Sequence, residues 1–176
     1  AAASLRWTGS WRTVFVTADR MGGLPVDADF EDALCRHVEP FRMAGHDVES
    51  DGPRYVALEI AMDVCVAPGY FRSHVKAALL AVFSSRTLPD GRRGLLHPDN
   101  FSFGQPVYLS RLYAAAHGVD GVQSVQITQF ERMGTPDPQP LADGRLDFAR
   151  LEIPRLDNDP NFRERGVFHL TVRGGK

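Results

Sequence analysis

The stretch Arg54-Tyr-Val-Ala-Leu-Glu-Ile-Ala-Met-Asp-Val-Cys-Val66 alternates between two kinds of side chain along its whole length. Every second position, from Val56 to Val66, carries a large apolar side chain, whereas the positions between them include Tyr, Glu and Asp. Successive side chains of a β-strand point to opposite faces of the sheet, so a period of two places all the large apolar groups on one face. The sequence therefore predicts a long strand over residues 54–66 with one buried face.

Three further strands are predicted on either side of this one. Residues 11–18 are rich in β-branched and aromatic side chains, which favour strands. Asp51-Gly52-Pro53 has the composition of a turn, so residues 46–50 are predicted to form a short paired strand before it. After the Gly121-Val122 pair, a strand is predicted to run to about Phe130.

Three segments have apolar residues at helical spacing. The first begins after Asp27, whose carboxylate can cap it, and Pro40 is predicted to end or kink it. The second follows Pro68-Gly69, and the third has Pro106 in its first turn and stops at Gly118. The predicted stripes are Phe30, Leu34, Val38 and Phe41 in the first helix, Phe71, Val75, Leu79 and Val82 in the second, and Leu109, Leu112, Tyr113 and Ala116 in the third.

The order strand, helix, strand, helix, helix, strand is typical of an α+β fold with a mixed sheet and helices packed on one face. Residues 136–140 contain three prolines, which indicates a semi-rigid linker. Two more strands, at 146–153 and 167–172, then predict a C-terminal β-hairpin arm. The predicted organisation is a start or linker over 1–10, an α+β domain over 11–132, a proline-rich linker over 133–140 and a two-stranded arm over 141–176.

Composition and charge argue against several classes of protein. Of the 176 residues, 43% are hydrophobic and 24% are charged, which is typical of a folded domain and not of a disordered chain. The 20 basic and 22 acidic residues form no basic stripe, so no nucleic-acid partner is expected. No apolar run approaches the roughly 18–20 residues that cross a bilayer. The two cysteines, Cys35 and Cys65, indicate buried thiols in a reducing compartment and not a disulfide framework.

Catalytic and cofactor-binding motifs are absent: there is no glycine-rich nucleotide loop, no nucleophile elbow and no His-Glu-x-x-His pair. The loop Asp157-x-Asp159-x-Asn161 copies the first three ligand positions of a calcium-binding loop. The copy then fails, because Phe162 and Phe168 stand where that loop needs a glycine and a bidentate glutamate. We therefore predict no metal, no cofactor and no enzymatic activity, and a turn in which Asx side chains bond their own backbone.

Two stretches of the chain carry a family resemblance. The first runs from Asp51-Gly-Pro-Arg-Tyr-Val-Ala-Leu-Glu-Ile through Val66-Ala-Pro-Gly-Tyr-Phe-Arg and Val75-Lys-Ala-Ala-Leu-Leu to Phe103-Gly-Gln-Pro-Val-Tyr-Leu-Ser-Arg-Leu-Tyr and Val119-Asp-Gly-Val-Gln-Ser-Val. The second, more distinctive stretch is Leu151-Glu-Ile-Pro-Arg-Leu-Asp-Asn-Asp-Pro-Asn with Arg165-Gly-Val-Phe-His-Leu. Together they resemble the baseplate J-like proteins, which are wedge components of contractile phage tails and related injection systems, over most of residues 11–175.

The resemblance implies a structural subunit without catalytic residues, of which this chain would be the C-terminal portion. Such subunits assemble as ring-forming wedges around a tail hub, through contacts with other baseplate proteins and with copies of themselves. The implied location is the bacterial cytoplasm during assembly and then the baseplate of the particle.

Candidate interface residues follow from the enrichment of large aromatic and Arg side chains in protein interfaces. They are Trp7, Trp11, Arg155 and Phe162, together with the carboxylates of Asp157 and Asp159, which a rigid turn presents in the same loop as Arg155 and Phe162. Two other functions stay open: a small-molecule-binding or regulatory α+β domain, and a hydrolase with loop-borne catalytic groups. A large apolar cleft would favour the first, and a His or carboxylate with a displaced pKa in that cleft would favour the second.

Overall fold

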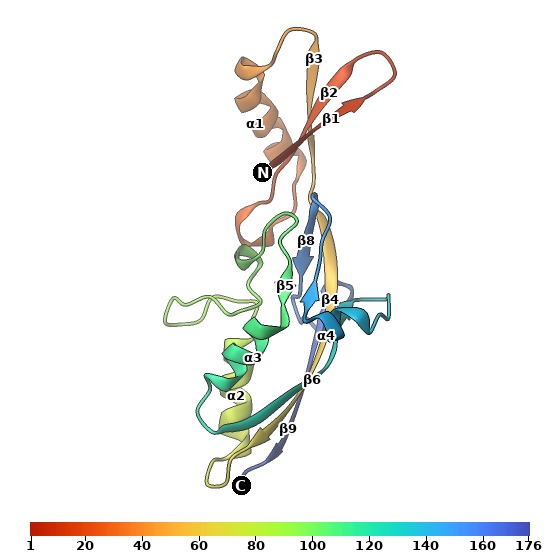
Figure 1. Ribbon diagram of the computed structural model, residues 1–176. Coiled ribbons are helices and arrows are strands. Elements are labelled where there is room, and N and C mark those ends of the chain that lie inside the picture. Colours follow the sequence, from red (N-terminus) through yellow and green to blue (C-terminus); the bar gives the residue numbers. More distant parts are fainter.

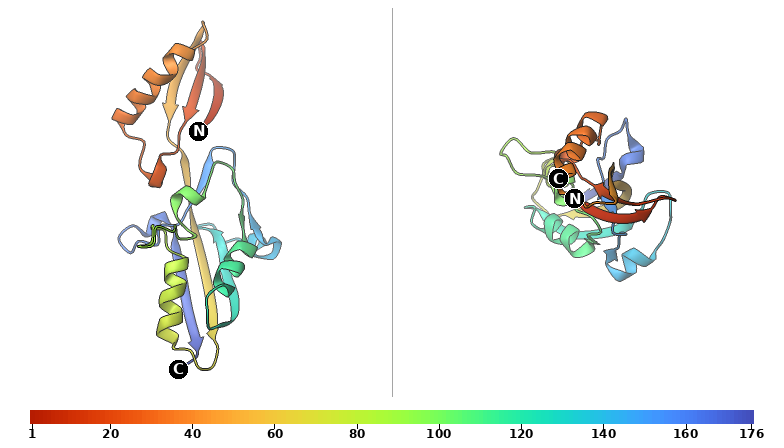
Figure 2. Two further views of the ribbon diagram at one scale, coloured as in Figure 1. Left: turned by 90° about the vertical axis from the view of Figure 1, so that its left-hand side faces the viewer. Right: turned by 90° about the horizontal axis from the view of Figure 1, so that it is seen from above.

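The computed structural model describes residues 1–176 and shows an elongated molecule made of two units in line (Figure 1, Figure 2). The N-terminal unit comprises residues 1–51, and the C-terminal unit comprises residues 54–176. Strand β3 (His46–Asp51) leads into strand β4 (Arg54–Val66) across only Gly52 and Pro53, so the two units follow each other along the long axis.

The N-terminal unit is a three-stranded sheet with one helix. Strands β1 (Ala2–Trp7) and β2 (Arg12–Thr17) form an antiparallel hairpin, and β3 pairs with β2 in parallel. A parallel pair needs a crossover connection, which helix α1 (Ala28–Val38) supplies between β2 and β3. The strands predicted at 11–18 and 46–50 are confirmed, whereas β1 lies within residues 1–10, for which no strand was predicted.

Helix α1 begins where the sequence predicts and ends just before Pro40. The Asp27 carboxylate accepts a hydrogen bond from the Phe30 backbone N–H at 3.0 Å, which caps the first turn. The helix ends at Val38, and a 3₁₀ turn that contains Pro40 follows it. Phe41 therefore leaves the predicted stripe, and it is 76% exposed instead of buried.

The C-terminal unit is organised around β4, which pairs with three other strands. Strand β6 (Val122–Arg132) lies antiparallel along one side of it. On the other side, β8 (Glu152–Arg155) pairs in parallel with the first part of β4, and β9 (Val167–Gly174) pairs in parallel with the rest. The predicted C-terminal β-hairpin is wrong, because β8 and β9 run in the same direction and follow each other along β4 instead of pairing with each other.

Gly166 makes the return from β8 to β9 possible. Its φ is +100°, and a Cβ there would lie 2.8 Å from the carbonyl oxygen of Arg155 and 2.9 Å from that of Leu58. Glycine alone combines this backbone conformation with such a close approach of three backbone segments. The chain can therefore leave β8, form a loop and return beside the next part of β4.

The core lies between this sheet and helices α2 (Arg72–Val82) and α3 (Leu109–His117), which cover one of its faces (Figure 2). The even positions of β4 from Leu58 to Val66 are at most 2% exposed, while its odd positions are half-buried, so the predicted alternation is confirmed. The predicted α+β class is confirmed as well. The buried apolar residues of this core include Leu58, Ile60, Met62, Val64, Val66, Val75, Leu79, Leu112, Ala116, Ile127 and Phe130.

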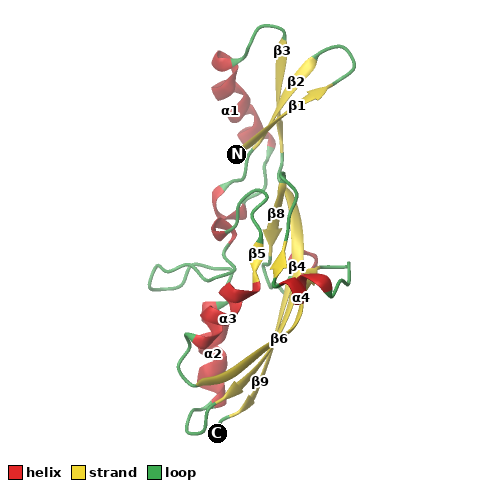
Figure 3. Cartoon of the chain, in the orientation of Figure 1, coloured by secondary structure: helices red, strands yellow, loops and turns green.

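The connections contain short elements that the sequence analysis did not predict. Strand β5 (Val107–Tyr108) pairs with β7 (Arg145–Leu146), so Pro106 precedes a strand and does not lie in the first turn of α3. Within the predicted linker 133–140, Gln139 starts the short helix α4 (Gln139–Asp143), with Pro140 in its first turn (Figure 3). The strand predicted at 146–153 is divided between β7 and β8, because residues 147–151 form no strand.

Candidate interaction surfaces

The two candidate tryptophans lie together at the turn of the β1–β2 hairpin. Trp7 is the last residue of β1 and Trp11 directly precedes β2 (Figure 1). The backbone N–H of Thr8 donates to the carbonyl oxygen of Trp11 at 3.1 Å, which closes the turn. Trp7 is 67% exposed and Trp11 is 61% exposed. Large aromatic side chains anchor many protein interfaces, so this hairpin tip is suited to contact a partner.

Other exposed apolar side chains of the N-terminal unit were not predicted. Seven of the twelve large hydrophobic residues that stand exposed belong to residues 1–51, although this unit holds less than a third of the chain. Two of them, Phe41 and Met43, follow α1. Pro40 is the signal that could have found them, because a proline that ends a helix also turns the next residues out of the helical stripe. The other five are Leu5, Trp7, Trp11, Met21 and Leu24.

The structure turns the candidate Arg155 inward. Its guanidinium donates to both carboxylate oxygens of Asp157 at 2.6–3.0 Å, and it lies 5.0 Å from the centre of the Tyr55 ring. These hydrogen bonds to Asp157 raise the pKa of Arg155 above its ordinary value. Both side chains of the pair are less than one-fifth exposed. The pair therefore holds the start of the loop against β4 and offers little charge to a partner.

The second half of the same loop is more open. The Asp159 carboxylate accepts a hydrogen bond from the Asn161 backbone N–H at 2.9 Å, which forms the predicted Asx turn. Phe162 is 44% exposed, and the guanidinium of Arg165 lies 4.3 Å from its ring centre. Phe162 is thus the loop candidate that a neighbouring subunit can reach. It belongs to the C-terminal unit, so the structure does not bring it together with the tryptophans of the hairpin.

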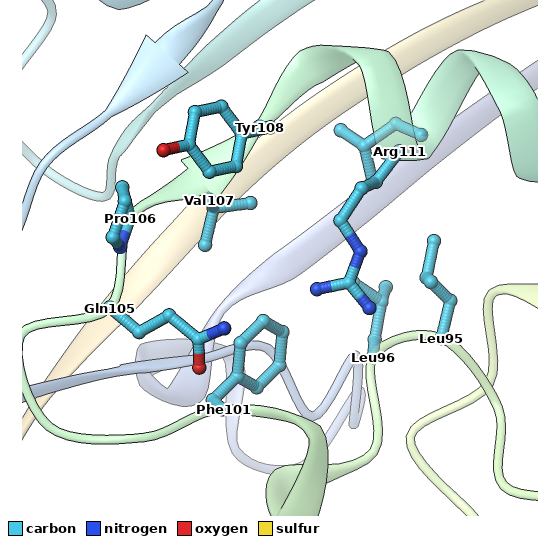
Figure 4. Close-up of a pocket in the computed structure, with 9 residues that line it drawn as sticks. Leu95, Leu96, Phe101, Gln105, Pro106, Val107, Tyr108 and Arg111 are labelled. Carbon is cyan, nitrogen blue, oxygen red and sulfur yellow. The ribbon is translucent and has the colours of Figure 1, made fainter.

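A small crevice lies in the C-terminal unit. It has a volume of about 350 Å³, open mouth included, and lies beside the start of α3 (Figure 4). Leu96, Phe101 and Val107 are among its mainly apolar lining residues, and Arg111 reaches across its mouth. This volume is at the low end of the range for ligand pockets, and a wider surface hollow of about 840 Å³, open mouth included, lies beside Ala78, Leu88 and Ala115. Burial raises the pKa of Asp19, but this carboxylate does not line the crevice.

A second ion pair of the C-terminal unit, between Arg132 and Glu152, is also structural. Glu152 is buried, and its carboxylate accepts hydrogen bonds from Arg132 at 2.8 Å and from the Ala149 backbone N–H at 2.9 Å. These contacts, led by that of Arg132, lower the pKa of Glu152. No group of three or more His, Cys, Asp or Glu side chains is placed to hold a metal ion. No helix has the length and apolar composition that a membrane crossing requires.

Residues 1–51 match the family model of the Baseplate J-like central domain. The matched stretch ends at Asp51, where β3 and the N-terminal unit end. The predicted family is thus found over this stretch, whereas the motifs that carried the resemblance lie in residues 51–170, which the match does not cover beyond Asp51. This family is structural and not catalytic, which suggests a structural role in a phage baseplate. No curated protein matches the chain.

Proposed function

We propose that this chain is part of a structural subunit of the baseplate of a contractile phage tail or a related injection system. In this role it contacts other tail proteins and copies of itself, and it resides in the finished particle. The proposal is carried by one coincidence: the stretch that matches the baseplate family is also the unit with most of the exposed large hydrophobic side chains. Large exposed aromatic side chains such as Trp7 and Trp11 are suited to anchor a contact with a partner.

The hairpin tip with Trp7 and Trp11 is the first proposed contact point. Tryptophan is among the residue types that contribute most to binding at interfaces. Both side chains lie outside the buried core, so their removal should weaken a contact without unfolding the chain. Phe162 is the second proposed contact point. Arg155 is a poor probe of the interface, because its replacement would free Asp157 and remove the support of Tyr55.

The test replaces Trp7 and Trp11 together by Ala in the full-length protein. The substitutions are made in the gene, so that the particle assembles from the variant protein. Electron microscopy then counts assembled baseplates. We expect a loss of at least about tenfold, since one interface hot spot contributes about 2 kcal/mol or more to binding. The melting temperature of the isolated chain should stay nearly unchanged.

Leu80→Ala is the matched control. Leu80 is also a large exposed apolar residue, but it lies on α2, outside the stretch that matches the family. We expect this variant to assemble normally. Normal assembly of the double tryptophan variant would contradict the role of the hairpin tip. If Phe162→Ala also assembles normally, both proposed contact points are wrong.

A further inference from the structure

The junction between the two units is narrow and polar. A single chain segment, Gly52–Pro53, connects them, and the buried apolar core contains no residue from the N-terminal unit. The space around Gly52 is open, since a Cβ there would meet no atom within 4 Å. Domains of one chain move relative to each other unless their interface is large and hydrophobic. The junction therefore lacks the usual cause of rigidity.

The first contact across the junction is made by the turn Met21–Gly23 of the N-terminal unit. The backbone N–H of Gly22 donates to the Asp99 carboxylate at 2.6 Å. Gly22 and Gly23 have φ values of +74° and +67°, and a Cβ on Gly23 would lie 3.0 Å from the Cβ of Pro98. Two glycines thus allow the turn to lie against Pro98 and to present its N–H to Asp99. Arg93 holds the same carboxylate from its own unit, at 3.2 Å.

The second contact lies beside the connecting segment. The Tyr55 hydroxyl donates to the Asp19 carboxylate at 3.0 Å, and the Arg155 guanidinium lies over the Tyr55 ring. A third contact joins the Arg150 guanidinium to the carbonyl oxygen of Ala3 at 2.7 Å. Water can replace each of these hydrogen bonds when the contact opens, so each contributes little net free energy.

We propose that the two units pivot about Gly52–Pro53 and that residues 19–23 form a latch, closed by Asp99 and Tyr55, that keeps the units in line. Opening the latch breaks a few hydrogen bonds and exposes no part of the apolar core. The chain then has two arrangements of similar free energy, and a partner that prefers one of them shifts the balance. This inference concerns contacts within the chain, so it stands or fails independently of the proposed baseplate role.

Pulsed electron paramagnetic resonance on the whole chain tests the latch. Cys35 and Cys65 are replaced by Ser, and spin labels are attached to Cys introduced at Ala33 on α1 and Ala77 on α2, both exposed. With the latch intact, we expect one narrow distance distribution. In the combined variant Asp99→Ala and Tyr55→Phe, we expect a broad distribution, because the loss of two hydrogen bonds lowers the ratio of closed to open chains by about tenfold.

Two further variants separate the latch from other effects. Asp99→Asn keeps an oxygen that can accept from the Gly22 N–H, so its distribution should stay narrow. Gly52→Ala, added to the combined variant, should narrow the distance distribution again, because alanine has fewer accessible backbone conformations than glycine. Circular dichroism confirms that each variant is folded.

Three results would overturn the proposal. The first is a broad distribution with the latch intact, and the second is a narrow one in the combined variant. The third is an Asp99→Asn variant whose distance distribution is as broad as that of the combined variant, which would assign the effect to the ion pair with Arg93. If the combined variant does not fold, the single variant Tyr55→Phe provides the test. We expect its ratio of closed to open chains to be about threefold lower than in the wild type. An unchanged distance distribution in this variant would contradict the latch.

Discussion

Both units cover a sheet with helices, yet they differ sharply in how much they bury. The N-terminal unit buries only Thr13, Thr17 and Ala18, and α1 contains no buried residue. The C-terminal unit holds all the other residues among the 28 that are buried, including every large apolar one. The charges differ too: residues 1–51 carry nine acidic and five basic groups, whereas the rest of the chain carries thirteen acidic and fifteen basic groups.

This difference separates the part of the chain that provides stability from the part that offers contacts. A unit of about 50 residues buries a small share of its surface and is marginal by itself. The N-terminal unit therefore has little stability to spare and, in the proposed role, gains stability from contacts with partners. Substitutions of buried residues in the C-terminal unit should destabilise the chain, while substitutions of exposed residues in the N-terminal unit should mainly change what it contacts.

The largest effect is expected in the core of the C-terminal unit. Ile60→Ala should lower the free energy of unfolding by about 2–5 kcal/mol, because Ile60 is fully buried and its truncation leaves a cavity. Glu59→Ala, on the opposite and half-buried face of β4, is the control and should lower it by less than about 1 kcal/mol. Urea titrations followed by circular dichroism measure both values. Equal losses would mean that both faces of β4 support the fold to the same degree.

The buried ion pair of the same unit should have the next largest effect. Glu152→Gln should lower the free energy of unfolding by about 1–3 kcal/mol at neutral pH, because Arg132 loses its charged partner. The pKa of Glu152 lies below its ordinary value of 4.5 in the folded chain, so this stability is present above about pH 4.5 and is lost as the pH falls through the lowered pKa. The urea midpoints of the two proteins should converge at acid pH. A difference between the two urea midpoints that persists at acid pH would show that the ionised carboxylate of Glu152 is not what stabilises the fold.

A smaller effect is expected from the apolar stripe of α1. Leu34→Ala should lower the stability by less than about 2 kcal/mol, because Leu34 is only half-buried. Hydrogen exchange should show faster exchange of the β2 and β3 amides and little change in β4, since regions with few buried contacts open separately. A loss equal to that of Ile60→Ala, with faster exchange in β4, would break the contrast between the two units.

The smallest effect on stability is expected at the junction. Tyr55→Phe should lower the stability at neutral pH by about 1 kcal/mol or less, because it removes one hydrogen bond to Asp19. Burial and the nearby Asp19 charge raise the pKa of Tyr55 from 10.0 to about 12. The stability linked to the neutral form of Tyr55 is therefore fully present below about pH 10 and is lost as the pH rises through about 12, whereas the Phe variant lacks this loss. Melting curves of both proteins across this pH range check the prediction. A melting temperature that falls equally in the wild type and in Tyr55→Phe would contradict it.

The sequence predicts the elements whose pattern is local. The alternation in residues 54–66 and the Asp27 cap depend on neighbours along the chain, and both are found in the structure. Strand pairing is not local, which is why the partners of the C-terminal strands were missed. Two apolar runs separated by a turn-rich loop look the same whether they pair with each other or each pair with a third strand, as β8 and β9 do with β4.

The candidate surface was predicted unevenly, for a similar reason. The exposed position of Trp7 and Trp11 depends on a short hairpin turn, which lies within a few residues of both. The inward position of Arg155 depends on Asp157, two residues along the chain, and on Tyr55, one hundred residues away, and no local signal indicates the contact with Tyr55. Sequence reasoning therefore identified the types of residue suited to an interface better than it identified which of them face outward.

The way β4 is connected has a mechanical consequence. A force that pulls the N-terminal unit away from the far end of the molecule acts along β4, since β3 continues into it almost in line (Figure 1). The hydrogen bonds that join β4 to β6 and β9 lie across this direction, so they are loaded together in shear and not one after another. In single-molecule pulling we expect a short extension at low force, when the junction opens, followed by rupture of the β4 ladders at a much higher force. The chain would thus yield slightly and then bear tension.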